Sequence, residues 1–298
     1  MPSISIILPV YNVAPYLEAC LDSLVAQTYQ DFDVIAVNDG SQDGSLAILE
    51  AYQAKLPQLR VISQQNQGLS AARNTGLKHV SGKYLYFLDS DDYLQHDMLA
   101  RCFALAEQEQ LDLVKFDAEP FTEDGVMTTN PYDSSAVLQE DKIYTQKEWL
   151  VAQHKHYNSP VWLFFIRTAL VLNNKMTFVD NLLHEDEIFT PQLFTKVERV
   201  MYIRQTFFKR RYRKGSIMQN NIYYSRASYD SKKRVIRLLD KEKSMVNTSA
   251  AKRFLSQRRN ILYMDSLSYD KALQVKIAMH PFVRWPLMAR VWIRKRRR

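Results

Sequence analysis

Three aspartates stand close together in one short stretch of the sequence, directly after an apolar run. Asp89, Asp91 and Asp92 follow residues 84–88. Carboxylates within a few ångströms of one another repel and raise each other's pKa, and a divalent cation removes that cost. Oxygen ligands without a Cys or His spacing favour Mg²⁺ or Mn²⁺, which complete their coordination with substrate phosphates and water. An acidic N-terminus of the next helix, expected over 94–110, is the alternative reading of the same residues.

The elements that must position these aspartates alternate along residues 1–119. Apolar runs typical of buried strands are separated by amphipathic helices, which indicates right-handed βαβ units and a mostly parallel sheet. The fold class is therefore α/β. We expect strands at 4–8, 32–37, 60–63, 84–88 and 113–116, and helices that begin near Pro15, Ser45, Ser70 and Leu94, with Ser70 as the cap of its helix.

Residues just beyond the strand ends are the next candidates, because ligands of such sheets bind outside the carboxyl ends of the strands. Tyr11 could lay its ring along a nucleobase, and Asp39 could accept hydrogen bonds from a base. Arg73 lies one turn into a helix from this edge and could reach a diphosphate. Taken singly, each residue is better explained as a core-packed Tyr, a turn Asp or a surface Arg. Together with the acidic cluster, they indicate a site for a nucleotide diphosphate and a metal.

Four motifs carry a family resemblance, in order and with few gaps, over residues 1–119. They are Ile-Ile-Leu-Pro-Val-Tyr-Asn at 6–12, Val-Asn-Asp-Gly-Ser-Gln-Asp-Gly-Ser at 37–45, Gly-Leu-Ser-Ala-Ala-Arg-Asn-Thr-Gly at 68–76 and Phe-Leu-Asp-Ser-Asp-Asp at 87–92. The set resembles the family 2 inverting glycosyltransferases of bacterial surface polysaccharide synthesis (capsule, lipopolysaccharide or exopolysaccharide). The resemblance implies the GT-A fold, a Rossmann-like and mostly parallel central sheet flanked by helices, with a helical C-terminal extension.

Binding roles follow from the resemblance position by position. It implies that the nucleotide part of a UDP-sugar contacts Pro9, Tyr11, Asn12, Asp39 and Arg73. Asp89 and Asp91 would be the family's Asp-x-Asp pair, with Asp91 as the direct ligand of Mn²⁺ or Mg²⁺ and Asp89 nearer the ribose. Asp92 is an additional carboxylate to which the resemblance gives no role.

Two later segments resemble further family motifs. His-Glu-Asp at 184–186 is similar to the family's Glu-Asp motif, and Tyr212 and Arg213, with Ser-Ile at 216–217, are similar to its downstream loop. The resemblance implies that Asp186 is the catalytic base and that Glu185 supports it or touches the acceptor. A single in-line displacement would then move the sugar to a hydroxyl of an oligosaccharide acceptor, one linked to a lipid carrier. An exposed helix start before 188–194 is the alternative reading of the acidic pair.

Other residues give weaker indications. Arg210, Arg211, Arg213 and Lys214 are expected to form a basic loop that closes over the diphosphate, with Arg213 in the family-like position, although a solvated charge run is equally possible. Trp162 and His156 are candidate acceptor contacts. The aromatic run at 161–166, however, is more typical of a core.

Charge is unevenly distributed, although the whole chain carries +8. Residues 1–119 hold 16 acidic and 7 basic side chains, whereas 280–298 hold seven basic side chains and no acid. Trp and Phe among these arginines predict attachment of 281–298 to an anionic membrane surface, with a docked or disordered basic end as the alternative. No signal peptide or membrane-spanning run is visible, and Cys20 and Cys102 are typical core residues. We therefore expect a cytoplasmic protein held peripherally at the inner face of the cytoplasmic membrane.

The expected organisation has four parts. Residues 1–119 form the nucleotide-sugar-binding half, 120–227 the acceptor-binding half with the base, 228–280 a helical extension and 281–298 the basic aromatic tail. Three other functions are alternatives. Nucleic-acid binding is disfavoured because the acidic N-terminal part repels the phosphate backbone. A sugar nucleotidyltransferase would have a Gly-rich phosphate-binding loop after the first strand, whereas this sequence has Pro-Val-Tyr-Asn at 9–12. A catalytically inactive sugar-nucleotide binder stays open.

Overall fold

The structure is a computed structural model that describes residues 1–122, 125–126, 129–213 and 225–267. The chain divides into two units, Met1–Lys214 and Gly215–Arg298, and each is described by itself. The expected boundary at residue 119 falls inside a strand of the first unit, Leu113–Thr122. The four-part division by function therefore stays a prediction.

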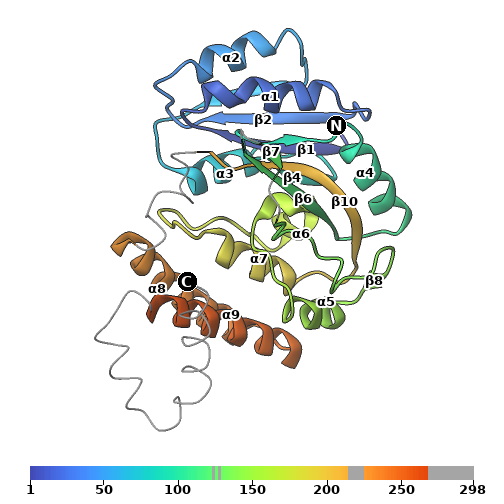
Figure 1. Ribbon diagram of the computed structural model, residues 1–298, viewed down its shortest axis with the longest axis vertical. Helices are drawn as coiled ribbons and strands as arrows, with labels where there is room; N and C mark the ends of the chain where they lie inside the picture. The colour runs from blue at the N-terminus through green and yellow to red at the C-terminus, as the bar shows by residue number, and fades with distance from the viewer. Residues whose placement is uncertain (123–124, 127–128, 214–224, 268–298) are drawn as a thin grey trace. The chain divides into compact units, whose positions relative to one another are not determined.

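One mixed sheet forms the centre of the first unit (Figure 1). Its main strand order is β3-β2-β1-β4-β9-β6-β10-β5, with β7 beside β6 and β8 beside β10. The strands are β1 (Ile4–Val10), β2 (Phe32–Asn38), β3 (Leu59–Ser63), β4 (Tyr84–Phe87), β5 (Tyr93–Leu94), β6 (Leu113–Thr122), β7 (Gly125–Val126), β8 (Ile143–Tyr144), β9 (Phe164–Arg167) and β10 (Val200–Arg211). The first four strands of the order are mutually parallel, β6 and β10 are parallel, and β9 runs antiparallel between these two groups. The expected α/β fold with a mostly parallel sheet is confirmed.

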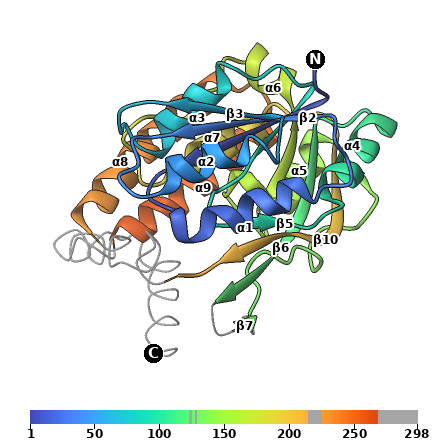
Figure 2. The same cartoon turned by 90° about the horizontal axis from the view of Figure 1, so that it is seen from above.

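Helices cover both faces of the parallel strands. They are α1 (Ala14–Val25), α2 (Ser45–Tyr52), α3 (Leu69–Leu77), α4 (Met98–Gln108), α5 (Gln146–Gln153), α6 (Thr168–Asn173) and α7 (Asp186–Phe194), with a short 3₁₀ helix at Val161–Leu163. Figure 1 shows α1 and α3 on opposite sides of β1, and Figure 2 shows β6 and β10 side by side, with β7 next to the end of β6. Because both faces are covered, every residue of β1 is buried. Cys20 and Cys102 are buried free thiols on α1 and α4, as expected.

Glycines allow α3 to begin and to pack where it does. Gly68 precedes the helix with φ +87°, a conformation that side-chain-bearing residues rarely adopt. A Cβ atom on Gly76 would stand only 2.5 Å from Ile7 Cγ2, so the helix lies directly against β1. The expectation that Ser70 caps this helix is wrong, since Gly68 occupies the N-cap position and no side chain caps it.

The expected helix over 94–110 also needs correction. Tyr93 and Leu94 form β5, which pairs antiparallel with β10, and α4 begins at Met98 after Asp97. Pairing with a distant strand therefore overrides the helical pattern at these two positions. The idea that Asp91 or Asp92 meets the dipole of this helix is wrong for the same reason, because neither lies in its first turn.

The second unit contains two helices among its described residues. Ser225 caps α8 (Arg226–Met245) by accepting a hydrogen bond from Ser228 N, and α9 (Ser249–Leu267) packs against α8. The expected helical extension is confirmed as far as the structure describes it, and the tail 281–298 lies outside the described residues. Within the described parts of both units, every helix is too short or too polar to cross a bilayer.

Candidate active site

The carboxyl ends of β1, β2 and β4 meet at one edge of the sheet because these strands are parallel. Asp39 N donates to Val10 O at 2.9 Å, which joins the residues that follow β2 to the end of β1. Asn12, in the left-handed region at φ +50°, accepts from Gln42 N at 2.8 Å and donates its own N–H to Ser41 Oγ. The expected gathering of strand-end residues is thus present in the structure.

Asp39 holds the loop that leads into α3. Its buried carboxylate accepts hydrogen bonds from Gln64 Nε2 at 2.7 Å, Gln67 N at 2.9 Å and Gly68 N at 2.8 Å. Tyr11 is different, because its ring is 47% exposed and open to a planar ligand. Pro9 is buried within β1, opposite Val37 of β2.

Arg73 brings three acidic residues from distant parts of the chain onto one guanidinium. The side chain is 1% exposed and projects from α3. Its Nη2 donates to Asp89 Oδ1 at 2.9 Å, and its Nη1 donates to Glu185 Oε1 at 2.9 Å and to Asp186 Oδ1 at 3.1 Å. The Asp-x-Asp segment and the Glu-Asp segment are therefore parts of one site. Arg73 is the residue that joins them.

Burial dominates the electrostatics of this cluster. Loss of water raises the pKa of Asp186 well above the usual value and also raises the pKa of Glu185, and the charge of Arg73 offsets only part of the effect. Burial by itself would lower the pKa of Arg73, but the charges of Asp186, Asp89 and Glu185 outweigh it and keep that pKa above its usual value. Asp186 is thus a carboxylate with increased affinity for a proton.

Asp92, for which the family resemblance implies no role, anchors the end of β10. Its buried carboxylate accepts from Arg210 Nη1 at 2.6 Å and from Arg211 N at 2.7 Å. Burial raises the pKa of Asp92 well above its usual value, against the lowering effect of Arg210. Arg213 Nε donates to Asp91 Oδ2 at 2.9 Å. The signal missed in the sequence is the complementarity between the acidic run at 89–92 and the basic run at 210–213.

The expected basic loop is therefore only partly a loop. Arg210 and Arg211 belong to β10, and their contacts are with the 91–92 segment. Arg213 follows the strand, and its guanidinium lies 4.9 Å from the ring centre of Tyr16. Lys214 and residues 216–217 lie outside the described residues.

Asp89 and Asp91 are chemically suited to a divalent cation. Their side chains are 21% and 15% exposed. Among the described residues, Asp89 Oδ2 and Asp91 Oδ1 accept no hydrogen bond, although Arg210 Nη1 lies 3.7 Å from the latter. No group of three His, Cys, Asp or Glu side chains in the described ranges could hold a metal alone. Two carboxylates are nevertheless a donor set to which Mg²⁺ binds when substrate phosphates supply further oxygens. The residues therefore fit this group.

The two candidate acceptor contacts differ in their surroundings. Trp162 is 3% exposed and stacks on Phe208 with 4.2 Å between ring centres, so it is a core residue and the acceptor interpretation is corrected. His156 is half-buried, and its Nε2 lies 3.0 Å from Asn158 Nδ2. Burial lowers the pKa of His156, which favours the neutral imidazole.

Comparison with known proteins shows the class of this fold. The structure matches that of Staphylococcus aureus TarS 1–349 in complex with UDP-GlcNAc, with a TM-score of 0.73 and 24% identity over 94% of this chain and 77% of that chain. It also matches the mannosyltransferase PcManGT of Pyrobaculum calidifontis in complex with GDP-Man and Mn²⁺, with a TM-score of 0.62 and 16% identity over 96% of this chain and 83% of that one. The fold is the GT-A fold.

The family follows from the sequence comparison. The model of glycosyl transferase family 2 matches residues 5–170, and the chain belongs to this family. It is 36% identical to the uncharacterized glycosyltransferase EpsJ of Bacillus subtilis over 214 residues, which are 70% of this chain and 60% of EpsJ. The chain therefore spans less than two thirds of that relative's length.

Proposed function

We propose that the protein is an inverting glycosyltransferase that moves a hexose from a UDP-sugar to a hydroxyl group of a glycan acceptor. The observation that carries this proposal is the Arg73 cluster, which unites the Asp-x-Asp carboxylate Asp89 with the Glu-Asp pair. A transferase needs a donor site and a base within reach of each other. One buried guanidinium, bonded to both segments, supplies that proximity.

Asp186 is the proposed base. It takes the proton of the acceptor hydroxyl as that oxygen attacks the anomeric carbon, and a raised pKa makes the carboxylate a stronger base. Glu185 supports Asp186 or contacts the acceptor. Arg73 fixes the position of both carboxylates through Nη1. One base and one displacement give inversion at the anomeric carbon.

Donor binding is assigned to the edge formed by β1, β2 and β4. The exposed ring of Tyr11 stacks on the base, and Pro9, Asn12 and Asp39 shape the nucleotide pocket around it. Arg213 faces the diphosphate beside Asp91. Asp89 and Asp91 would hold Mn²⁺ or Mg²⁺. When bound, that cation neutralises the charge that develops on the departing diphosphate.

The acceptor and the location of the enzyme are further parts of the proposal. The motif set resembles enzymes of bacterial surface polysaccharide synthesis, so we propose a lipid-linked oligosaccharide as acceptor. The basic aromatic segment 281–298 would attach the enzyme to anionic lipid at the inner face of the cytoplasmic membrane. This segment lies outside the described residues, and the proposal for it is based on sequence.

The decisive experiment compares the wild type with Asp186→Asn. UDP release from UDP-glucose, UDP-galactose and UDP-N-acetylglucosamine is measured with Mn²⁺, and UDP binding is measured by calorimetry. We expect UDP binding to persist in the variant and UDP release to fall by about 10²–10⁴-fold, the usual contribution of a general base. Glu107→Gln, which changes a surface pair with Lys83, is the matched control.

Three outcomes would contradict the proposal. UDP release by Asp186→Asn at the wild-type rate would show that Asp186 is not the base. Binding of UDP without release from any donor, in the wild type, would indicate an inactive binder. Formation of pyrophosphate from UTP and a sugar phosphate would indicate a nucleotidyltransferase.

A further inference from the structure

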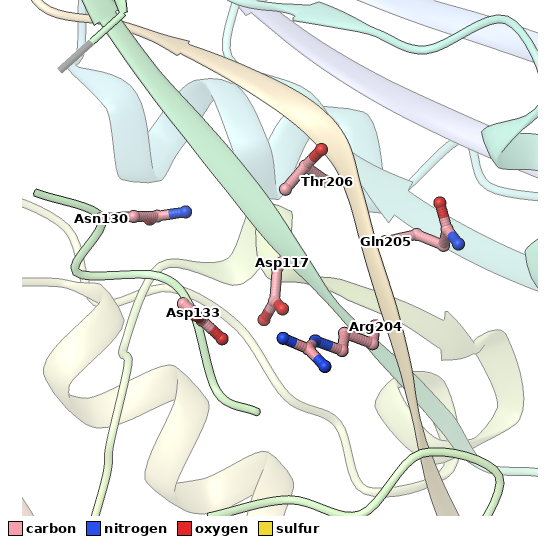
Figure 3. Close-up of a pocket in the computed structure, with 6 residues that line it drawn as sticks. All are labelled: Asp117, Asn130, Asp133, Arg204, Gln205 and Thr206. Atoms are coloured by element: carbon pink, nitrogen blue, oxygen red, sulfur yellow. The ribbon is translucent and has the colours of Figure 1, made fainter. Parts of the chain in front are cut away.

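A second polar cavity lies along β6 and β10, apart from the carboxylate cluster around Arg73. It has a volume of about 270 Å³ and is lined by Asp117, Asn130, Asp133, Arg204, Gln205 and Thr206. Figure 3 shows the side chains of Asp117, Asp133 and Arg204 pointing toward one another, with Gln205 directed away from them. These residues come from β6, from the segment that follows β7 and from β10.

A break in strand pairing opens this part of the sheet. Ile203 pairs with Phe116 and Thr206 pairs with Asp117, so Arg204 and Gln205 have no partner on β6. Such bulges re-aim side chains and often lie near functional sites. Arg204 N donates to Glu140 Oε1 at 3.1 Å, which fixes the backbone of the bulge. The guanidinium of Arg204 points toward Asp117 and Asp133, as Figure 3 shows.

The floor of the cavity is preorganised by a buried polar network. Asp117 Oδ1 accepts from Ser134 N at 3.1 Å and lies 3.5 Å from Lys115 Nζ, and Tyr202 donates its hydroxyl proton to Asp117 Oδ2. Asn130 Nδ2 donates to Ala118 O at 2.7 Å. These bonds fix the floor before any ligand arrives.

The rim carries two exposed groups of opposite charge. Asp133 accepts from Ser135 N at 2.8 Å, and its exposed carboxylate also interacts with the Ser135 side chain. The Arg204 guanidinium has neither an ion pair nor a hydrogen bond with any described residue. A donor and an acceptor therefore face each other across a space that a ligand with several hydroxyl groups can fill.

The charge balance narrows the class of ligand. Lys115 compensates Asp117, and Arg204 compensates Asp133, so the cavity has little net charge and does not favour phosphate or a nucleotide. All of its lining residues have polar side chains, which does not suit a lipid chain. A neutral sugar ring, with hydroxyl groups that both donate and accept, matches these groups.

We propose that this cavity binds a neutral sugar residue of the acceptor glycan, remote from the hydroxyl group that receives the transferred sugar. The inference rests on the proposed function, because it assumes a glycan acceptor. Thr206 and Arg210 are four residues apart on the extended strand β10, about 13 Å at roughly 3.3 Å per residue, and Arg210 contacts Asp92 in the first site. An acceptor of several sugars spans this separation.

Binding of defined sugars to the full-length protein tests the inference. The probes are glucose, galactose, N-acetylglucosamine, cellobiose, lactose and chitobiose at millimolar concentration, followed by saturation-transfer NMR. Arg204→Ala and Asp133→Ala are expected to weaken binding about tenfold or more, the value of a lost hydrogen bond to a charged group. Both residues are exposed, so the variants should unfold at the wild-type temperature. Lys83→Ala, which alters an exposed ion pair elsewhere, is the control and should bind as the wild type does.

Two results would overturn the inference: binding of no sugar in the panel by the wild type, or equal binding by the wild type and the two cavity variants. UDP binding is measured on the same samples, because it reports the donor site alone. If the wild type does not bind UDP, the proposed function is contradicted. If it binds UDP but none of the sugars, only the cavity assignment is contradicted.

Discussion

At the scale of single residues, the guanidinium of Arg73 neutralises charge from three segments of the chain. A planar fork of donors bonds two carboxylates through Nη1 and a third through Nη2. Its position near the ligand edge of the sheet, and the family resemblance, predicted that Arg73 contacts the nucleotide. The structure shows both terminal nitrogens engaged with acidic side chains, which supports a positioning role that reaches the donor through Asp89.

Substitution of Arg73 tests this positioning role. Arg73→Gln leaves buried carboxylates without a cation, which costs about 3–5 kcal/mol of stability. A small displacement of the base costs about 10²-fold in rate, so kcat should fall by that order while KM for the UDP-sugar changes little. Arg73→Lys keeps the charge without the fork and should restore part of kcat. Steady-state kinetics and urea denaturation measure both effects.

Arg167→Lys is the matched control, since Arg167 forms a pair with Asp112 at 3.4 Å that is more exposed than the Arg73 cluster. Equal kcat loss in the Lys and Gln variants would indicate a purely structural role for Arg73. An increase in KM at unchanged kcat would instead indicate that Arg73 binds the nucleotide directly.

At the scale of elements, local sequence pattern located β1, β2, β4 and the helices between them, because apolar runs and helical stripes record burial directly. The position of β9 was not accessible in this way. Residues 164–167 read as an aromatic run, and their antiparallel place between β4 and β6 depends on pairing with strands far away in the chain. β5 has only two residues, too few for a periodic signal.

The contact between α3 and β1 yields a prediction for Gly76. Gly76→Ala places a Cβ atom 2.5 Å from Ile7 Cγ2 in a buried strand, so the helix or Ile7 must move. Overpacking of this kind costs about 1–3 kcal/mol. Because α3 carries Arg73, we also expect UDP release to fall. Denaturation midpoints and donor turnover measure the two effects.

A double variant shows whether the contact is the cause. Ile7→Ala removes the obstructing methyl groups, so Gly76→Ala/Ile7→Ala should be more stable than the sum of the two single costs predicts. Additive costs would contradict the close-approach argument. Gly44→Ala, whose new Cβ would meet its nearest neighbour at 3.8 Å, is the control with a small expected effect.

At the scale of the whole molecule, sequence separation decided which parts of the site could be predicted. Residues 89–92 stood out because three aspartates are adjacent in the chain. The pairing of Arg73 with Glu185 joins positions 112 residues apart, and no local pattern connects them. Trp162 shows a different limit of local sequence patterns, because an aromatic residue of the core and one that contacts a sugar cannot be told apart in sequence.

The buried network around Lys115 predicts how stability depends on pH. Burial lowers the pKa of Lys115 to about 8, whereas the unfolded chain keeps the ordinary value of 10.5. Above pH 8 Lys115 is therefore protonated less often in the folded state than in the unfolded state, so its own contribution to stability rises with pH. The buried thiols of Cys20 and Cys102, whose pKa values burial raises, act in the opposite direction. A single group contributes at most about 1.4 kcal/mol per pH unit, so the gain between pH 8 and 10 is about 2 kcal/mol. Urea denaturation at several pH values measures it. Lys115→Met lacks this contribution, so the wild type should gain about 2 kcal/mol relative to the variant between pH 8 and 10. A difference between the two proteins that stays constant with pH would contradict the prediction.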